Sequence, residues 1–297
     1  MILLIYGHNG WIGQQFLELL KDKDYTVILG KAICDNYIEV EEEILKNNPT
    51  NIISFIGRTH GNNMQSIYNN NYYYNYSTID YLEQKGKLYE NIRDNLFSPL
   101  ILVLLADKYN CHLTYLGTGC IFKYEEDKFE EEKDGFREED LPNFFGSSYS
   151  IVKGFTDRIM KISSNVLNLR IRMPITNINH PRNFITKITS YEKICSVKNS
   201  MSILPDLLPI LIDMAEKKIT GTFNFTNPGL ISHNEILEMY KEIVDPNFTW
   251  NNFSIEEQSK ILAADRSNNY LDTSKLESLY NIPNIKESVR NILSNWK

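Results

Sequence analysis

The stretch ILLIYGHNGWIG, residues 2–13, decides the fold. It begins with a short apolar run at residues 2–6, which predicts a buried β-strand. Gly7, Gly10 and Gly13 follow, and the chain then carries apolar side chains at helical spacing. Three glycines between a strand and a helix allow a tight turn and let the backbone approach a pyrophosphate at the helix N-terminus. The stretch therefore predicts a strand, a dinucleotide-binding turn and a helix.

Further apolar runs follow this opening stretch and alternate with helical patterns. They lie at residues 25–29, 51–56, 112–116 and 166–171, and a helix is predicted at residues 99–109. Continuous apolar strands that alternate with helices are typical of a parallel sheet covered on both faces. The sequence therefore predicts an α/β fold with a Rossmann-type, doubly wound parallel sheet, which binds ligands at the carboxyl ends of its strands.

The pattern changes after residue 172, where prolines interrupt the apolar runs. These prolines are Pro174, Pro181, Pro205 and Pro209. Ser232-His-Asn-Glu235 has the form of a capping box and predicts a helix over residues 236–243. We expect residues 1–172 to form the dinucleotide-binding domain with the catalytic residues. Residues 173–297 are expected to form a smaller, mostly helical substrate-binding region, with some segments returning to the sheet.

Composition and charge exclude several classes of function. The net charge of −7 over 297 residues argues against a nucleic-acid partner, because phosphate binding needs a basic surface. No apolar run approaches the roughly 20 residues that span a bilayer, and the N-terminus lacks the pattern of a signal peptide. The four cysteines are scattered and form no metal-binding motif. We expect a cytoplasmic protein with no metal site and no membrane partner. Residues 62–91 form a segment that is rich in Asn and Tyr.

The end of the second predicted strand indicates which dinucleotide is bound. It carries Gly30 and Lys31 and no acidic residue. An acid there would bind the ribose hydroxyls of NAD, whereas a cation tolerates the additional phosphate of NADP. We therefore predict NADPH as the cofactor, with NADH as the alternative. The residues expected to bind it are Gly7, Asn9, Gly10, Trp11, Ile12, Gly13, Lys31, Gly57, Arg58, Tyr149 and Lys153.

Tyr149 and Lys153 place a phenol and an ammonium one helical turn apart on the same face. A nearby cation favours phenolate, so we expect the pKa of Tyr149 to be lowered towards the working pH. Such a tyrosine can protonate the alkoxide that forms when a hydride reaches a ketone. Thr118 lies just after a predicted strand, where its hydroxyl can hydrogen-bond the same carbonyl. These residues predict a ketone reductase.

Six longer motifs occur in a fixed order along the chain. They are Thr118-Gly-Cys-Ile-Phe122, Arg172-Met-Pro-Ile175, Pro181-Arg-Asn-Phe-Ile-Thr-Lys187, Phe225-Thr-Asn-Pro-Gly229, Ser232-His-Asn-Glu-Ile-Leu-Glu-Met-Tyr240 and Arg266-Ser-Asn-Asn269. With the glycine turn and the Tyr/Lys pair, the chain resembles the extended short-chain dehydrogenase/reductase family, which acts largely on nucleotide sugars. The six motifs narrow the resemblance, over the whole chain, to the bifunctional 3,5-epimerase/4-reductases of UDP-L-rhamnose synthesis, known as the C-terminal half of plant rhamnose synthases.

The resemblance implies a substrate and a role for each catalytic residue. The substrate would be UDP-4-keto-6-deoxy-D-glucose, which is epimerised at C3 and C5 before NADPH reduces the 4-ketone. Cys120 and Lys187 would exchange the ring protons, and Tyr149, with Lys153 and Thr118, would complete the reduction. The residues expected to bind the substrate are Thr59, Cys120, Asn183, Phe184, Arg266 and Asn269.

The resemblance also bears on the partners of the chain. Dehydratases of the wider family carry an Asp-Glu pair directly after the catalytic threonine, where this chain has Gly119-Cys120. A separate 4,6-dehydratase would therefore supply the substrate. Members of the family are commonly homodimers, so the resemblance implies a possible homodimer.

Three other functions remain open from the sequence. A single-function reductase of dTDP- or UDP-4-keto-rhamnose would not need Cys120. An enzyme similar to GDP-fucose synthases would pair Cys120 with a histidine, for which His180 is the candidate. A non-catalytic binding subunit can share the same fold, although the chain retains the whole catalytic set.

Overall fold

The computed structural model describes residues 1–61, 78–124 and 135–297. Within these residues, parallel strands form a six-stranded sheet in the order β2-β1-β3-β4-β5-β7. The strands are β1 (Ile2–Tyr6), β2 (Thr26–Leu29), β3 (Asn51–Ser54), β4 (His112–Thr118), β5 (Val166–Ile171) and β7 (Gly221–Asn224). The chain winds outward from β1 in both directions, which confirms the predicted Rossmann-type sheet. The carboxyl ends of β1 and β3 therefore border the point where ligands bind in such sheets.

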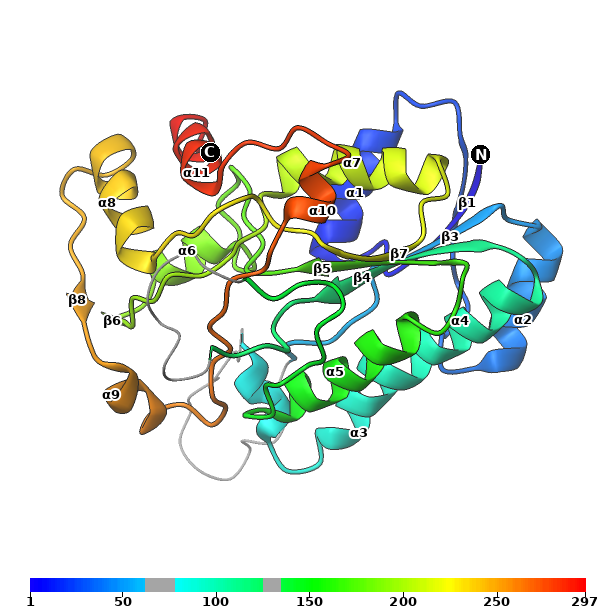
Figure 1. Cartoon of the computed structure of the whole chain (residues 1–297), viewed down its shortest axis with the longest axis horizontal. Coiled ribbons are helices and arrows are strands. Elements are labelled where there is room, and N and C mark those ends of the chain that lie inside the picture. Colours follow the sequence, from blue (N-terminus) through cyan, green and yellow to red (C-terminus); the bar gives the residue numbers. More distant parts are fainter. Residues whose placement is uncertain (62–77, 125–134) are drawn as a thin grey trace.

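Helices cover both faces of this sheet, as Figure 1 shows. They are α1 (Trp11–Leu20), α2 (Tyr37–Asn47), α3 (Leu88–Ile92), α4 (Ser98–Lys108), α5 (Ser148–Met160), α6 (Phe184–Thr189), α7 (Leu204–Glu216), α8 (His233–Ile243), α9 (Ile255–Ser259), α10 (Ser274–Glu277) and α11 (Ile285–Ser294), with the 3₁₀ turn η1 (Ile79–Glu83) and the π-turn η2 (Arg93–Phe97). None of the described helices is both long and apolar enough to cross a bilayer.

The alternation of side chains along β1 divides the core into two layers. Leu3 and Ile5 pack against α1 and α7, in a buried cluster that includes Phe16. Leu4 points to the opposite face and packs with Val40 of α2 and with residues of α4. Each strand therefore lies between two apolar helix layers, which is why its sequence is continuously apolar.

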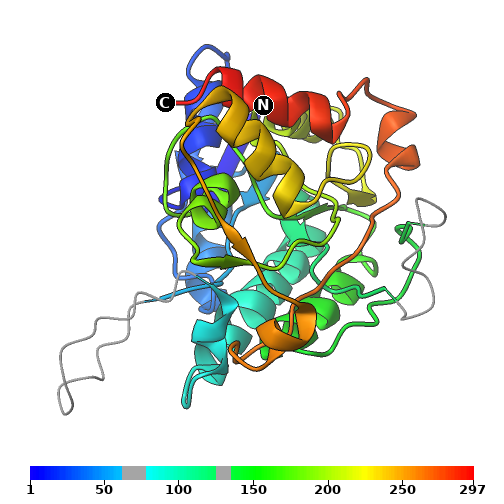
Figure 2. The same ribbon diagram turned by 90° about the vertical axis from the view of Figure 1, so that its left-hand side faces the viewer.

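The C-terminal residues contribute to both the sheet and an outer region. Residues 204–224 return to the sheet as α7 and β7. A third apolar cluster joins α6, α8 and α11, and Figure 2 shows α8 and α11 side by side. Ser232 and Glu235 form the predicted capping box at the start of α8. The short strands β6 (Lys193–Ile194) and β8 (Asn251–Asn252) pair in parallel at the edge of this region.

Two strand ends differ from the prediction. β3 ends at Ser54, the last residue that pairs with β1; the backbone N–H of Phe55 still donates to the Tyr6 carbonyl at 3.0 Å, and the Phe55 ring packs on Phe16 with the ring centroids 5.0 Å apart. β4 continues to Thr118, which pairs with Ile171 of β5. Thr118 is thus the last residue of β4 and does not follow the strand.

Candidate active site

The turn between β1 and α1 is shaped by its glycines. Gly7 has a φ of +73°, and a Cβ there would lie 2.8 Å from the carbonyl carbon of Phe55. A Cβ on Gly13 would lie 2.5 Å from the carbonyl oxygen of Gly7, so neither position accepts a larger residue. In the described chain, no side chain caps the N-terminus of α1 and its first turn holds no acid. These N–H groups fit the pyrophosphate of a dinucleotide.

Trp11 connects this turn to the outer region. Its ring stacks on His180, with centroids 5.4 Å apart and planes 6° apart. His180 Nδ1 also accepts a hydrogen bond from the backbone N–H of Arg182 at 3.1 Å. These contacts place His180 beside the glycine turn, which argues against its pairing with Cys120. Ile12 is half-buried against the core, and Asn9 is exposed at the turn.

An acidic side chain stands at the end of β2, where the sequence predicts none. Glu43 of α2 accepts hydrogen bonds from the backbone N–H groups of Lys31 at 2.8 Å and Ala32 at 3.2 Å. The hydroxyl of Tyr6 donates to the same carboxylate at 2.8 Å. The Lys31 side chain is exposed beside it. The strand end therefore carries both a hydrogen-bonded carboxylate and an exposed cation, and the local sequence shows only the cation.

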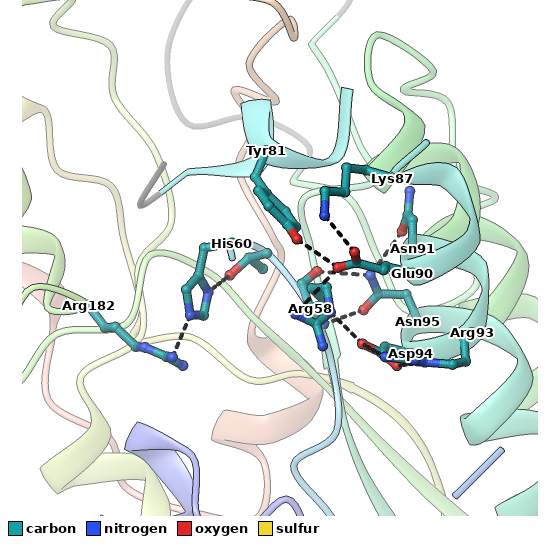
Figure 3. Close-up of polar contacts among 11 residues, drawn as sticks. Arg58, His60, Tyr81, Lys87, Glu90, Asn91, Arg93, Asp94, Asn95 and Arg182 are labelled. Carbon is teal, nitrogen blue, oxygen red and sulfur yellow. Dashed lines mark hydrogen bonds and ion pairs between the residues drawn. The ribbon is translucent and has the colours of Figure 1, made fainter. Parts of the chain in front are cut away.

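The segment after β3 carries Gly57, Arg58, Thr59 and His60. The backbone N–H of Arg58 donates to Asn95 Oδ1 at 2.9 Å, and Asn95 Nδ2 donates back to the Arg58 carbonyl at 2.8 Å. The Arg58 guanidinium pairs with Asp94 at 2.5 Å (Figure 3). Arg58 is thus bound to η2. These contacts hold the exposed Gly57 in place beyond the carboxyl end of β3.

Tyr149 and Lys153 lie on α5 and are both almost fully buried, with 7% and 4% of their surface exposed. Tyr149 hydrogen-bonds Thr118 at the end of β4. The Lys153 ammonium donates to the hydroxyl of Tyr115 in β4, and it lies 4.6 Å from the centroid of that ring. Tyr115 was not predicted to belong to the site.

The pKa of Tyr149 is raised above its ordinary value, so the expected lowering is wrong. Burial is the largest cause, because a phenolate loses its hydration there. The charge of Cys120 adds to the rise, and the hydrogen bond from Thr118 opposes it. Burial also lowers the pKa of Lys153 to about 7, so this lysine is not a permanent cation that could offset the burial of its neighbour.

Cys120 lies directly beside this pair. It packs in a small apolar cluster with Tyr81, Leu82 and Tyr149. Its backbone N–H donates to Thr118 Oγ1 at 3.1 Å, and its carbonyl accepts a hydrogen bond from Ser150 at 2.7 Å. The half-buried thiol is therefore held on the same side of β4 as the reductase residues.

Lys187 lies on α6, near Arg182, Arg266 and His60. Burial lowers the pKa of Lys187 to about 8, and the charges of Arg182 and Arg266 lower it further. The imidazole of His60 shares this environment. Burial is the largest cause that lowers its pKa to about 4, and the positive charges of Arg182, Lys187 and Arg58 lower it further. Lys187 thus lies among cations, and its neutral form is accessible near neutral pH.

Four predicted substrate residues make contacts within the protein. Asn183 is buried and caps α6, while its amide donates to the carbonyls of Thr176 and Ile178. Asn269 is buried and donates to the carbonyls of Gly119 and Phe122. Phe184 packs edge-on against His233, and Arg266 forms an ion pair with Asp80. Asn269 therefore orders the loop around Cys120. Asp80 of η1 also accepts hydrogen bonds from the backbone N–H groups of Ala263 and Ala264, so it joins η1 to residues 263–266.

The residues that sequence reasoning missed are Tyr115, Glu43, Arg182 and Asp80, whereas His60 belongs to the segment at residues 58–61 that is expected to border the cofactor and the sugar. Each missed residue reaches the site through a contact between distant parts of the chain, as in Lys153 with Tyr115 and Arg182 with His60. The one local signal is in β4, where Tyr115 alternates with Thr114 and Leu116 and so faces α5. The segment at residues 62–77, within the predicted Asn/Tyr-rich stretch, lies outside the described residues.

Known proteins resemble this chain over its whole length, although no protein-family model matches it. Protein L780 of Acanthamoeba polyphaga mimivirus is 54% identical over 296 residues, which cover 99% of this chain and 98% of that protein. Its crystal structure, described as a UDP-rhamnose synthase, has a TM-score of 0.92 and covers 99% of both chains. The bifunctional dTDP-4-dehydrorhamnose 3,5-epimerase/dTDP-4-dehydrorhamnose reductase of Arabidopsis thaliana is 41% identical over 96% of this chain and 90% of the plant protein. This chain belongs to the nucleotide-sugar 3,5-epimerase/4-reductase family.

Membership in the epimerase/reductase family confirms the resemblance predicted from the six motifs. A trifunctional UDP-glucose 4,6-dehydratase/3,5-epimerase/reductase of Arabidopsis thaliana is 40% identical to this chain, which covers 41% of that protein. A dTDP-4-dehydrorhamnose reductase from Clostridium acetobutylicum has a TM-score of 0.77 at 18% identity, over 99% of this chain and 98% of that chain. At 18% identity, the likeness to the Clostridium reductase shows a shared fold alone.

Proposed function

We propose that this chain converts UDP-4-keto-6-deoxy-D-glucose to UDP-L-rhamnose by 3,5-epimerisation and NADPH-dependent reduction of the 4-ketone. The observation that carries this proposal is the grouping of Cys120, Thr118 and Tyr149 around one end of β4. A ketone reductase alone needs only the tyrosine and the threonine. A thiol packed against the same tyrosine places a proton-exchange group beside the same sugar ring.

The reduction uses the Tyr149 side of the site. NADPH supplies the hydride to C4 when it is bound, and the glycine turn before α1 and Lys153 would hold it. Thr118 donates a hydrogen bond to the substrate oxygen, and Tyr149 gives its proton to that oxygen as negative charge develops there. The raised pKa of Tyr149 keeps the phenol protonated at neutral pH, so it serves as a proton donor.

The epimerisation uses Cys120 and Lys187. The 4-ketone acidifies the hydrogens on C3 and C5, so each centre inverts if one group removes a proton from one face and another returns a proton to the opposite face. The pKa of Lys187 is about 8, which suits proton transfer near neutral pH. The single-function reductase is disfavoured, since it gives the Cys120–Tyr149 contact no purpose.

The substrate needs a separate source. Elimination of water between C5 and C6 requires an acid and a base next to the catalytic threonine, and Thr118 is followed by Gly119 and Cys120. A distinct 4,6-dehydratase site would therefore provide the keto sugar. The relatives differ in the nucleotide that their names carry, UDP in one and dTDP in another, so both substrates belong in the assay.

NADPH is proposed over NADH on the exposed side chain of Lys31. Glu43 already accepts three hydrogen bonds, from two backbone N–H groups and a phenol, so fewer acceptor positions are left for the ribose hydroxyls of NADH. The flexible ammonium of Lys31 can reach a 2′-phosphate beside this carboxylate. This arrangement tolerates the phosphate of NADPH.

A homodimer through α4 and α5 is also proposed. These helices lie side by side on one face of the sheet, and each exposes large apolar side chains to solvent (Figure 1). Leu104 is 50% exposed and Phe155 is 58% exposed, which is costly for a surface without a partner. Phe155→Glu should convert a dimer to a monomer in light scattering, and an unchanged mass would rule this face out.

Turnover of the purified protein tests the proposed function. Protein given NADPH and UDP-4-keto-6-deoxy-D-glucose should oxidise the cofactor and form UDP-L-rhamnose, with the dTDP substrate run in parallel. Failure to form rhamnose from either substrate would refute the proposal.

A cysteine variant then separates the two reactions. Cys120→Ala should abolish rhamnose formation and the exchange of ring hydrogens for deuterium, while NADPH binding is retained. Cys195→Ala is the matched control, because Cys195 is buried at β6 outside the site. Unchanged deuterium exchange in Cys120→Ala would remove this thiol from the mechanism and favour the single-function reductase.

A further inference from the structure

Two residues from distant parts of the chain meet near Lys187. His60 follows β3, and Arg182 lies just before α6. The Arg182 guanidinium makes a hydrogen bond with His60 Nε2 (Figure 3). His60 Nδ1 lies 3.2 Å from Thr59 Oγ1. A guanidinium only donates hydrogen bonds, so Nε2 must be the unprotonated acceptor and Nδ1 must carry the single proton.

Arg182 differs from its neighbouring arginines in its partner. Arg58 pairs with Asp94, and Arg266 pairs with Asp80, so a carboxylate balances each of these charges. In the described parts of the chain, Arg182 forms no ion pair, and its guanidinium meets only the neutral imidazole of His60. Its orientation is therefore fixed while its positive charge stays uncompensated.

The neighbourhood of Arg182 is also electropositive. Lys187 lies close enough to Arg182 for the two charges to interact, and Arg182, Lys187 and Arg58 all place positive charge near His60. Positive charge that is held in place without an acid is an electrostatic site for an anion. A guanidinium suits a phosphate particularly well, because its planar fork of N–H groups matches two phosphate oxygens.

We propose that Arg182 binds the diphosphate of the nucleotide sugar and that His60 is a positioning residue that aims its guanidinium. This inference rests on the proposed function for the identity of the substrate. A dinucleotide also carries a diphosphate, so the two sources share their chemistry. Arg182 lies between the two ligand sites, since it precedes α6 with Lys187 and its backbone contacts His180, which stacks on Trp11 at the start of α1. Separate titrations with the two diphosphates therefore distinguish the sources.

Calorimetric titration of the full chain with UDP and, separately, with NADP⁺ tests the role of Arg182. Arg182→Met keeps the length of the side chain and removes its charge. It should weaken UDP binding by about 10- to 100-fold, as the loss of a charge-assisted bond predicts, and leave NADP⁺ binding within about 2-fold. Arg290→Met is the control, because Arg290 is exposed on α11 and pairs with Glu242. Unchanged UDP affinity would overturn the proposal, and so would a loss confined to NADP⁺.

A matched pair of His60 variants tests the positioning role. A glutamine places its amide oxygen near the position of Nε2, whereas an asparagine is too short to reach it. His60→Gln should retain UDP affinity, and His60→Asn should lose about 3- to 10-fold, with KM raised and kcat nearly unchanged. Equal affinity in the two variants would refute the positioning role.

The nitrogen resonances of His60 give a readout that simple packing would not change. In the parent protein, NMR should show a proton on Nδ1 and none on Nε2, and the ring should stay neutral down to low pH. In Arg182→Met, the pKa of His60 should move towards its ordinary value, since a cation has been removed. An Nε2-protonated ring in the parent protein would contradict the proposed geometry. Absence of turnover with normal UDP binding would count against the proposed function and leave the role of Arg182 intact.

Discussion

The contact between Lys153 and Tyr115 makes a quantitative prediction for Tyr115→Phe. The substitution removes the hydroxyl that accepts the lysine hydrogen bond. It keeps the aromatic ring, whose centroid lies 4.6 Å from the ammonium, so the packing and the cation–π contact remain. The hydrogen bond favours the charged lysine, and its loss should lower the pKa of Lys153.

The size of this effect follows from the energy of a hydrogen bond to a charged group. Such a bond contributes about 1.5–3 kcal/mol, and one pKa unit corresponds to about 1.4 kcal/mol. The pKa of Lys153 should therefore fall by about one to two units from its value of about 7. At pH 7 the ammonium fraction would fall from about half to roughly a tenth or less.

The assay is the pH profile of kcat/KM for NADPH oxidation with the keto sugar. If reduction needs the ammonium form of Lys153, activity falls as pH rises through its pKa, and Tyr115→Phe should move this alkaline limb down by about one to two pH units. In the same variant, the pH profile of deuterium exchange at the ring carbons should match that of the parent protein. Tyr280→Phe is the control, because the Tyr280 hydroxyl is likewise hydrogen-bonded to a charged side chain, donating to Asp213 at 2.6 Å, but lies outside the site. An unmoved alkaline limb would show that Tyr115 does not set the protonation of Lys153.

Three further changes test other parts of the structure. Gly13→Ala should weaken NADPH binding by at least about 10-fold, measured by fluorescence titration, because its Cβ would lie 2.5 Å from the Gly7 carbonyl oxygen. Lys31→Ala should raise the KM for NADPH about 3- to 10-fold and leave that for NADH unchanged, and an equal effect on both would refute the proposed phosphate contact. Asp157→Asn should cost about 3–5 kcal/mol in urea unfolding, because it leaves the buried Arg170 without its 2.7 Å carboxylate partner. A loss below 1 kcal/mol would contradict this last estimate.

Local sequence patterns predicted the fold well because each strand and turn has its own signal. The turn at Gly7 needs a positive φ, and the apolar runs are continuous because helices cover both faces. The ends of strands were less certain, since apolarity does not report pairing. Phe55 is apolar but lies beyond the last paired residue of β3, whereas Gly117 and Thr118 extend β4 by pairing with β5.

The residues of the candidate site also fall into two groups, those that local spacing identifies and those that only the fold brings together. Tyr149 and Lys153 share one helix, and Thr118 and Cys120 lie two residues apart, so local spacing identifies them. Glu43 reaches the end of β2 only because α2 packs beside it, a contact that no local motif encodes. Sequence spacing also does not predict the direction of the Tyr149 pKa shift. It shows a neighbouring charge, but it does not show the burial that outweighs that charge.

The two lysines of the site show how one side chain acquires two roles. Burial lowers the pKa of both, but the charges around them differ in sign. Asp157 raises the pKa of Lys153, whereas Arg182 and Arg266 lower that of Lys187. A diphosphate bound at Arg182 would offset those cations, so Lys187 would hold its proton to higher pH when substrate is present. That electrostatic coupling favours Lys187 as the group that returns a proton to the ring and Cys120 as the group that removes one.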